Sequence, residues 1–243
     1  MFFLTTIIVC GLAAVTFYFK RTGTLASLAA IRAANAACIH SSSQPPVAVF
    51  IGATSGIGEW MARIFAEHTK GNSNIVIVGR NRAAAERIFA SMPKPPPGNG
   101  IAAREFVQCD VSLMKNVQAA TQHILLRYPK INYLVMSPGL MTLAGRDETT
   151  EGIDKKLAVH YYARWKFLND LLPAAKKARD DGGQGVVMSV LAAGKGAPVN
   201  LDDLALKNTF SLVNVSMAAP TYTDLMMEVG HSFASFSNVL ISL

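Results

Sequence analysis

Short apolar segments alternate along this chain with longer segments whose apolar residues recur near the helical period. The short segments are rich in Val and Ile and lack strict polar alternation, which is typical of strands covered on both faces. They lie at residues 47–52, 75–79, 105–109, 132–137, 185–190 and 238–243. The longer segments predict helices over residues 57–70, 83–92, 113–127, 152–179 and 217–236. This repeated alternation predicts an α/β fold with a doubly wound parallel sheet.

The N-terminal segment differs because residues 1–19 carry no charged side chain and are followed at once by Lys20 and Arg21. A helix of ~20 apolar residues is long enough to cross a bilayer. A cleavable signal peptide normally begins with a positive region, which this chain lacks. We therefore expect an uncleaved membrane anchor at residues 1–21, with the globular part facing the cytosol because the positive residues follow the span. A mispredicted leader or a buried helix is the alternative.

The rest of the chain is expected to form a linker at residues 22–46 and one domain at residues 47–243. Residues 93–100, PKPPPGNG, predict a surface loop because proline and glycine interrupt helices and strands. With 243 residues, of which 51% are hydrophobic and 16% charged, the composition indicates a folded chain of one or at most two domains.

Charge and cysteine usage exclude several classes of protein. The net charge of +7 is spread along the chain rather than gathered in a basic stripe, so we expect no nucleic-acid partner. Cys10, Cys38 and Cys109 lie far apart without metal-ligand spacing. This pattern argues against a structural zinc or a disulfide scaffold and is typical of a reducing compartment, so no metal is expected.

The most informative motif, GATSGIG, lies between the first predicted strand and the first predicted helix. Glycine there permits a tight turn, the close approach of a phosphate to the backbone, and packing of helix on strand. Amides at the helix start, with its positive dipole end, then bind the anion. The residues expected to cradle a pyrophosphate are Gly52, Thr54, Ser55, Gly56, Ile57 and Gly58. The alternative is a glycine-rich turn without a ligand.

In this context the spacing Gly-x-x-x-Gly-x-Gly resembles that of the short-chain dehydrogenase/reductase family. The resemblance extends from about residue 46 to the end and implies a Rossmann-like domain that binds a nicotinamide dinucleotide. NAD-preferring members place an acid after the second strand, where this chain has Arg80 and Asn81. An arginine there suits a 2′-phosphate, so the resemblance implies that NADPH is preferred over NADH. A solvated arginine is the alternative.

Two further positions match the family. Asp110 and Val111 follow the third predicted strand and match the pair on the adenine side of the cofactor. After the fourth predicted strand the family usually has Asn-Asn-Ala-Gly, of which this chain keeps only Gly139. The stretches at residues 151–165 and 189–194 resemble a divergent branch that is common in fungi, whose members are usually described only as NAD(P)-binding oxidoreductases.

Family chemistry is hydride transfer between nicotinamide and a carbonyl or alcohol of a small molecule. A serine positions the oxygen, a tyrosine exchanges the proton, and a lysine four residues later lowers the pKa of the tyrosine. Ser189 matches the serine, although a strand-end serine bonded to backbone is the alternative. Tyr222 is the only tyrosine after Ser189, and Met226 stands where the lysine is expected. The Tyr-x-x-x-Lys element is therefore not intact.

Other assignments of the catalytic positions remain open. If the helical tail fixes the register, the tyrosine and lysine positions fall near Ser216 and Pro220, and neither side chain suits the role. His160 stands where the family usually has asparagine, and with the adjacent Tyr161 and Tyr162 it is a candidate replacement. A tyrosine pair on an apolar helix face is more commonly core packing.

The family continues beyond a sixth strand, whereas this sequence stops at Leu243, so we expect a fold shortened at the C-terminus. The leading interpretation is an NADP-dependent oxidoreductase that acts on an unknown small molecule. The alternatives are a catalytically impaired dinucleotide-binding scaffold and a truncated family member. Substrate, reaction direction and homo-oligomerisation stay open.

Overall fold

The computed structural model of this protein describes residues 27–40, 44–94, 102–192 and 195–234. The chain divides into two compact units, Met1–Ser41 and Ser42–Leu243. In the first unit the structure describes helix α2 (Leu28–His40), which occupies part of the segment expected to be a linker. The expected anchor at residues 1–21 lies outside the described residues. Among the helices that are described, none has the length and apolar character needed to cross a membrane.

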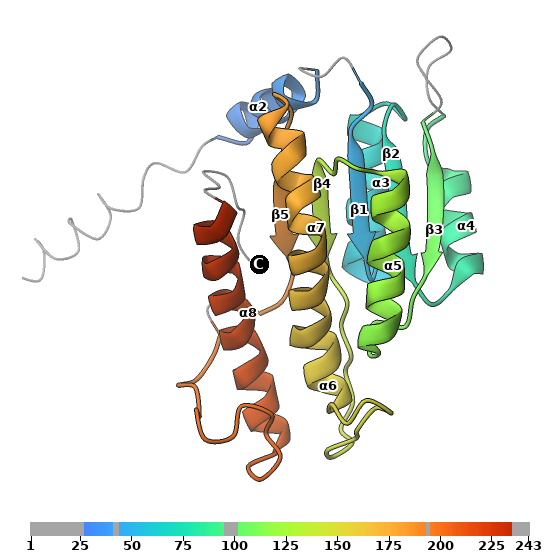
Figure 1. The fold of residues 1–243 in the computed structure, drawn as a ribbon. Helices are drawn as coiled ribbons and strands as arrows, with labels where there is room; N and C mark the ends of the chain where they lie inside the picture. The colour runs from blue at the N-terminus through green and yellow to red at the C-terminus, as the bar shows by residue number, and fades with distance from the viewer. Residues whose placement is uncertain (1–26, 41–43, 95–101, 193–194, 235–243) are drawn as a thin grey trace, which may run out of the picture. The chain divides into compact units, whose positions relative to one another are not determined.

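The second unit is built on a five-stranded sheet in which each strand runs parallel to its neighbours (Figure 1). The strands are β1 (Val47–Ile51), β2 (Asn74–Gly79), β3 (Arg104–Gln108), β4 (Tyr133–Met136) and β5 (Val186–Ser189). Their order is β3-β2-β1-β4-β5, so the strand order reverses between β1 and β4. Each strand overlaps one predicted from the sequence, and the α/β fold class is confirmed. The sixth predicted strand, at residues 238–243, lies outside the described part of the chain.

Helices cover both faces of the sheet. They are α3 (Gly56–His68), α4 (Arg82–Ser91), α5 (Met114–Arg127), α7 (Ala163–Asp180) and α8 (Leu212–Ala234). Phe50 of β1 belongs to the core under α3 and α4, whereas Ile51 belongs to the core under α5 and α7. Successive strand residues point to opposite faces, so a continuous run of Val and Ile supplies both cores.

The helix that follows β4 has an irregular start. A short α6 (Lys155–Leu157) continues into a π-helical turn, η1 (Ala158–Tyr162), and then into α7. Thr223 of α8 is fully buried and its hydroxyl donates to the carbonyl of His160 in this turn, at 3.2 Å. π-Turns of this kind occur frequently at functional sites. This hydrogen bond joins α8 to the irregular segment that carries His160.

Helix α8 begins at Leu212, earlier than the helix predicted from residue 217. The Ser211 hydroxyl accepts a hydrogen bond from the backbone N–H of Asn214 at 2.9 Å, which caps the helix start. Pro220 lies inside the helix. The helix predicted from residue 217 already included Pro220, so the sequence pattern missed only the first turn of α8.

Candidate functional site

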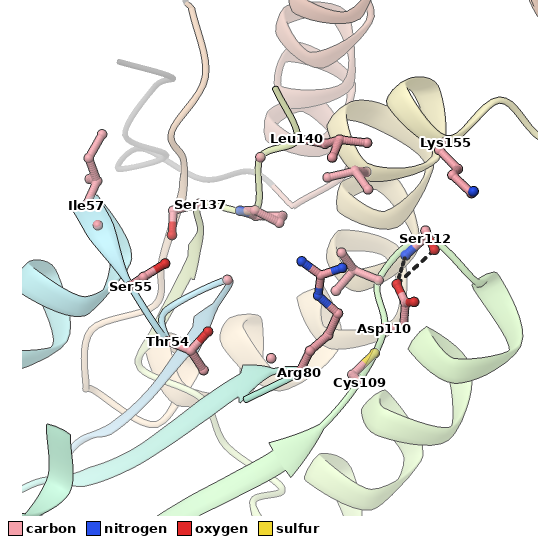
Figure 2. A pocket seen from close by; sticks show the side chains of 17 residues that line it. Thr54, Ser55, Ile57, Arg80, Cys109, Asp110, Ser112, Ser137, Leu140 and Lys155 are labelled. Atoms are coloured by element: carbon pink, nitrogen blue, oxygen red, sulfur yellow. Dashed lines mark hydrogen bonds between the residues drawn. The ribbon is translucent and has the colours of Figure 1, made fainter. Parts of the chain in front are cut away.

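A cavity of about 550 Å³ lies at the carboxyl ends of the strands, where the strand order reverses between β1 and β4 (Figure 2). Open α/β sheets bind their ligands at this place. The residues that line it are Gly52, Thr54, Ser55, Gly56, Ile57, Gly79, Arg80, Cys109, Asp110, Val111, Ser112, Ser137, Pro138, Gly139, Leu140, Lys155 and Val159. Nine of the eleven residues that the sequence assigned to cofactor binding are in this set; Gly58 and Asn81 are not.

One end of the cavity is the turn from β1 into α3, which we call the phosphate-loop end (residues 52–58, with Arg80 and Asp110). Gly52 has φ +78° and Gly56 has φ +61°, a region that favours glycine. A Cβ on Gly52 would lie 2.6 Å from Cα of Pro138, so only glycine lets the loop approach the β4 segment. Ser55 is the N-cap of α3 and its side chain makes no capping hydrogen bond. The first amides of α3 are therefore left for an anion.

Gly58 and Asn81 support the site without lining it. A Cβ on Gly58 would overlap the Ser137 hydroxyl, so this glycine lets α3 pack against the β4 segment. Asn81 is the N-cap of α4, and its side chain accepts from the backbone N–H of Ala84 at 3.0 Å. The sequence placed both residues at the cofactor site. In the structure Gly58 permits the packing of α3, and Asn81 caps α4.

Arg80 and Asp110 extend from the ends of β2 and β3 into the same end of the cavity (Figure 2). Arg80 is exposed, and in the described part of the chain its guanidinium makes no hydrogen bond or ion pair. Asp110 accepts from the backbone N–H and the hydroxyl of Ser112, at 3.0 and 2.8 Å through the same oxygen. Cys109 is buried beside it, and desolvation together with the Asp110 charge raises the pKa of its thiol to about 12. The thiol therefore stays protonated.

The other end of the cavity is lined by residues 137–140. We call it the β4–β5 end and include residues 136, 189 and 190, which share hydrogen bonds with Arg164 but do not line the cavity. Gly139 and Leu140 line the cavity here, and the backbone N–H of Leu140 donates to Nε2 of His160 at 3.0 Å. Desolvation and the positive charge of Arg164 lower the pKa of His160 to about 4. His160 is thus neutral, and its Nε2 lone pair is used to hold Leu140 in place.

Ser189 is fully buried at the end of β5 and does not line the cavity. Its hydroxyl accepts from Nη1 of Arg164 at 2.7 Å. Arg164 is only 1% exposed and also donates to the carbonyls of Met136 at 2.9 Å, Pro138 at 2.6 Å and Val190 at 3.0 Å. The serine expected to position a substrate oxygen is therefore engaged by a buried guanidinium.

Tyr222 also lies away from the cavity. Its hydroxyl donates to the carbonyl of Leu204 at 3.2 Å, and its ring stacks edge-on with Tyr161 at 5.3 Å between centroids. Desolvation raises its pKa above the usual value, and the neighbouring Tyr162 and Asp203 add to the effect. Ser189, Tyr222 and His160 thus each bond to groups of the protein itself, and none of them lines the cavity.

The sequence reasoning missed the roles of Lys155 and Glu151. Lys155 lines the cavity and its ammonium pairs with Asp147 at 2.7 Å. Glu151 accepts from the backbone N–H groups of Met114 and Lys115, at 2.6 and 3.1 Å, and so caps α5 from 36 residues away. A capping contact over this separation leaves no local signal. The described residues contain no cluster of three or more His, Cys, Asp or Glu that suits a metal ion.

Comparison with known proteins identifies the class. The sequence profile of the short chain dehydrogenase family matches residues 46–228. This match covers most of the chain, which therefore belongs to the short-chain dehydrogenase/reductase family, as the sequence motifs predicted.

Individual relatives agree with this assignment. Oxidoreductase AN1596 of Emericella nidulans is 38% identical over 181 residues, which cover 74% of this chain and 52% of the relative. Oxidoreductase andH of Emericella variicolor is 34% identical over 202 residues, which cover 83% and 57%. This chain thus spans little more than half the length of both. A metagenomic short-chain oxidoreductase solved in complex with NADP has the same fold, with a TM-score of 0.56 and 20% identity over 80% of this chain and 79% of that chain.

Proposed function

We propose that this chain is the dinucleotide-binding part of an NADP(H)-dependent oxidoreductase that reduces a carbonyl or oxidises an alcohol of a small molecule. The observation that carries the proposal is the phosphate-loop end of the cavity. There a glycine turn, the open start of α3 and the exposed Arg80 face one space. Family membership and a structural relative solved with NADP support it.

The residues present fit a dinucleotide. A side chain at Gly52 would close the loop against Pro138, so the cradle requires glycine. In the proposed complex residues 52–57 hold the pyrophosphate, Asp110 and Val111 flank the adenine, and Gly139 and Leu140 form the wall at the other end. When bound, the nicotinamide supplies or accepts the hydride.

Arg80 is the proposed determinant of cofactor choice. It follows β2, where an acid would bind the ribose hydroxyls of NAD, and its guanidinium has no partner in the described chain. A charge-assisted hydrogen bond to a 2′-phosphate stabilises the complex by roughly 1.5 to 3 kcal/mol, or about ten- to a hundredfold in the dissociation constant. NADPH is therefore expected to bind more tightly than NADH.

Calorimetry with NADPH and NADH tests the proposal. Arg80→Ala should remove most of the preference for NADPH and leave NADH binding little changed. Arg82→Ala is the matched control, because Arg82 lies two residues away and its guanidinium stacks on Phe106 at 4.9 Å without lining the cavity. Equal affinity of the unchanged chain for both dinucleotides contradicts the assignment of Arg80, and no binding of either contradicts the proposed function.

A second function is favoured by one observation. Among the described residues that line the cavity there is no tyrosine, and Lys155, which does line it, pairs with Asp147. A dinucleotide-binding scaffold without turnover would need no proton donor there. A panel of ketones, aldehydes and alcohols with saturating cofactor separates the two functions: binding without turnover favours the scaffold.

The membrane anchor at residues 1–21 also stays a proposal, supported by the uncharged sequence of residues 1–19 and by Lys20 and Arg21, which follow it. Carbonate extraction of membranes from cells that express the full chain tests it. Retention in the pellet supports an anchor, and release into the supernatant contradicts it.

A further inference from the structure

Arg164 is the largest side chain among the fully buried residues, and its interactions are unusual for a buried cation. The four hydrogens of its two terminal nitrogens are taken by three backbone carbonyls and one hydroxyl. In the described part of the chain it makes no ion pair with a carboxylate, and its Nε has no hydrogen-bond partner. Burial of a charge without a counter-ion is unfavourable, and an apolar side chain of similar size would avoid that penalty. The charge itself therefore calls for an explanation.

The guanidinium lies directly behind the cavity wall. Its partners Met136 and Ser189 end β4 and β5, Val190 follows β5, and Pro138 itself lines the cavity. A dinucleotide in this fold lies across the point where strand order reverses. Because Arg80 and the phosphate loop mark the adenosine half, the nicotinamide half falls at the β4–β5 end. This placement rests on the proposed function.

We propose that Arg164 sets the redox preference of the dinucleotide site, because its buried positive charge at the β4–β5 end disfavours the cationic oxidised nicotinamide relative to the neutral reduced one. Arg164 is thus a positioning residue whose hydrogen bonds shape the wall and whose charge selects the reduced cofactor. The two forms of the dinucleotide differ by one positive charge on the ring, so any fixed charge behind the ring acts on the difference in their affinities.

Charges nearby do not cancel this effect. The positive charge of Arg164 is one cause of the lowered pKa of His160, so its field reaches the residue that holds Leu140 at the wall. His160 is neutral and adds no charge. Lys155 is paired with Asp147.

Two further charged groups act at this end. The carboxylate of Asp154 raises the pKa of His160, but by less than Arg164 lowers it, and the charge of Lys156 lowers it as well, so the net field there is positive. Buried Asp154 accepts from the backbone N–H groups of Asp147, Lys156 and Leu157. The Lys156 ammonium donates to the carbonyl of Gly145 at 2.8 Å. A unit charge acting across a cavity of this size, at an effective dielectric constant of about 20, changes an affinity about tenfold.

The test is the ratio of the dissociation constants of NADP⁺ and NADPH, measured by calorimetry on the full chain. We expect the unchanged protein to bind NADPH about tenfold more tightly than NADP⁺. Arg164→Met, which removes the charge but keeps an apolar stem, should bring the ratio close to one. Arg164→Lys, which keeps the charge and loses the planar fork, should retain most of the ratio even where both affinities fall.

The control and the variants distinguish an effect of the Arg164 charge from a purely structural role. Lys176→Met is the control, because Lys176 is an exposed cation on the same helix that pairs with Asp180, and its ratio should match that of the unchanged protein. If Arg164→Met weakens both ligands equally and leaves the ratio unchanged, Arg164 is only structural and the proposal fails. If that variant does not fold, Arg164→Gln provides the neutral comparison. Equal affinities in the unchanged protein also overturn the proposal, whereas failure to bind either form overturns the proposed function instead.

Discussion

The two ends of the cavity use their polar groups differently. At the phosphate-loop end the start of α3 and the guanidinium of Arg80 face open space. At the β4–β5 end Arg164, His160 and Ser189 hydrogen-bond to each other or to the backbone. We therefore propose that the first end binds an anion, whereas the polar groups of the second end hold its own backbone in place. A family motif marks both ends in the sequence, but only the first keeps its groups available.

The largest expected effect is at the junction of the two ends. Gly52→Ala adds a Cβ 2.6 Å from Pro138 at a backbone with φ +78°. Overpacking and left-handed strain each cost about 1 to 2 kcal/mol, so the free energy of unfolding should fall by about 3 kcal/mol. NADPH binding should be lost.

Urea unfolding and calorimetry measure the two quantities. Gly139→Ala is the matched control for stability, because Gly139 also lines the cavity but has nothing within 4 Å of an added Cβ. Its unfolding free energy should stay within about 0.5 kcal/mol of the unchanged protein. Equal stability of both variants would contradict the proposed contact between the loop and the β4 segment.

The next effect depends on pH and probes the β4–β5 end. The pKa of His160 in the folded protein, about 4, lies below the ordinary histidine value of 6.5, so the unfolded state binds more protons between these two pH values. The contribution of neutral His160 to the free energy of unfolding is complete above pH 6.5. It decreases by about 3 kcal/mol as the pH falls toward 4. His160→Gln keeps an acceptor for Leu140 and does not titrate. The free energy of unfolding of the unchanged protein should therefore fall relative to that of His160→Gln as the pH is lowered from 6.5 toward 4. Parallel pH profiles of the two proteins would refute the neutral histidine.

A smaller effect is expected at Ser189. Ser189→Ala leaves one Arg164 N–H without an acceptor, so the unfolding free energy should fall by about 1 to 3 kcal/mol. NADPH affinity should stay within about twofold because Ser189 does not line the cavity. Ser216→Ala is the control, since that exposed hydroxyl bonds only within α8. Unchanged stability combined with lost turnover would restore the catalytic role that the sequence suggested for Ser189.

The strands were predictable from the sequence because buried parallel strands leave continuous apolar runs, and the phosphate loop because its glycines are required by backbone geometry. The motif places Ser189 at the end of a strand, but it does not determine to which face of the sheet the side chain points. Val187 and Ser189 point to the α7 side by the two-residue period, toward Arg164. The available signal in the sequence was Arg164, an arginine within the otherwise apolar buried face of α7. The cap of α5 by Glu151 had none, because the contact is formed only by the fold.

Hydrogen exchange of the full chain with and without saturating NADPH tests most directly whether the cavity binds through its phosphate-loop end. We expect slower exchange at amides of residues 52–58, 80–82 and 110–112, with smaller protection at residues 139–140. Amides around Tyr222 in α8, which lies outside the cavity, should show no change. Protection centred on Tyr222 and Leu204, with none at residues 52–58, would contradict this expectation.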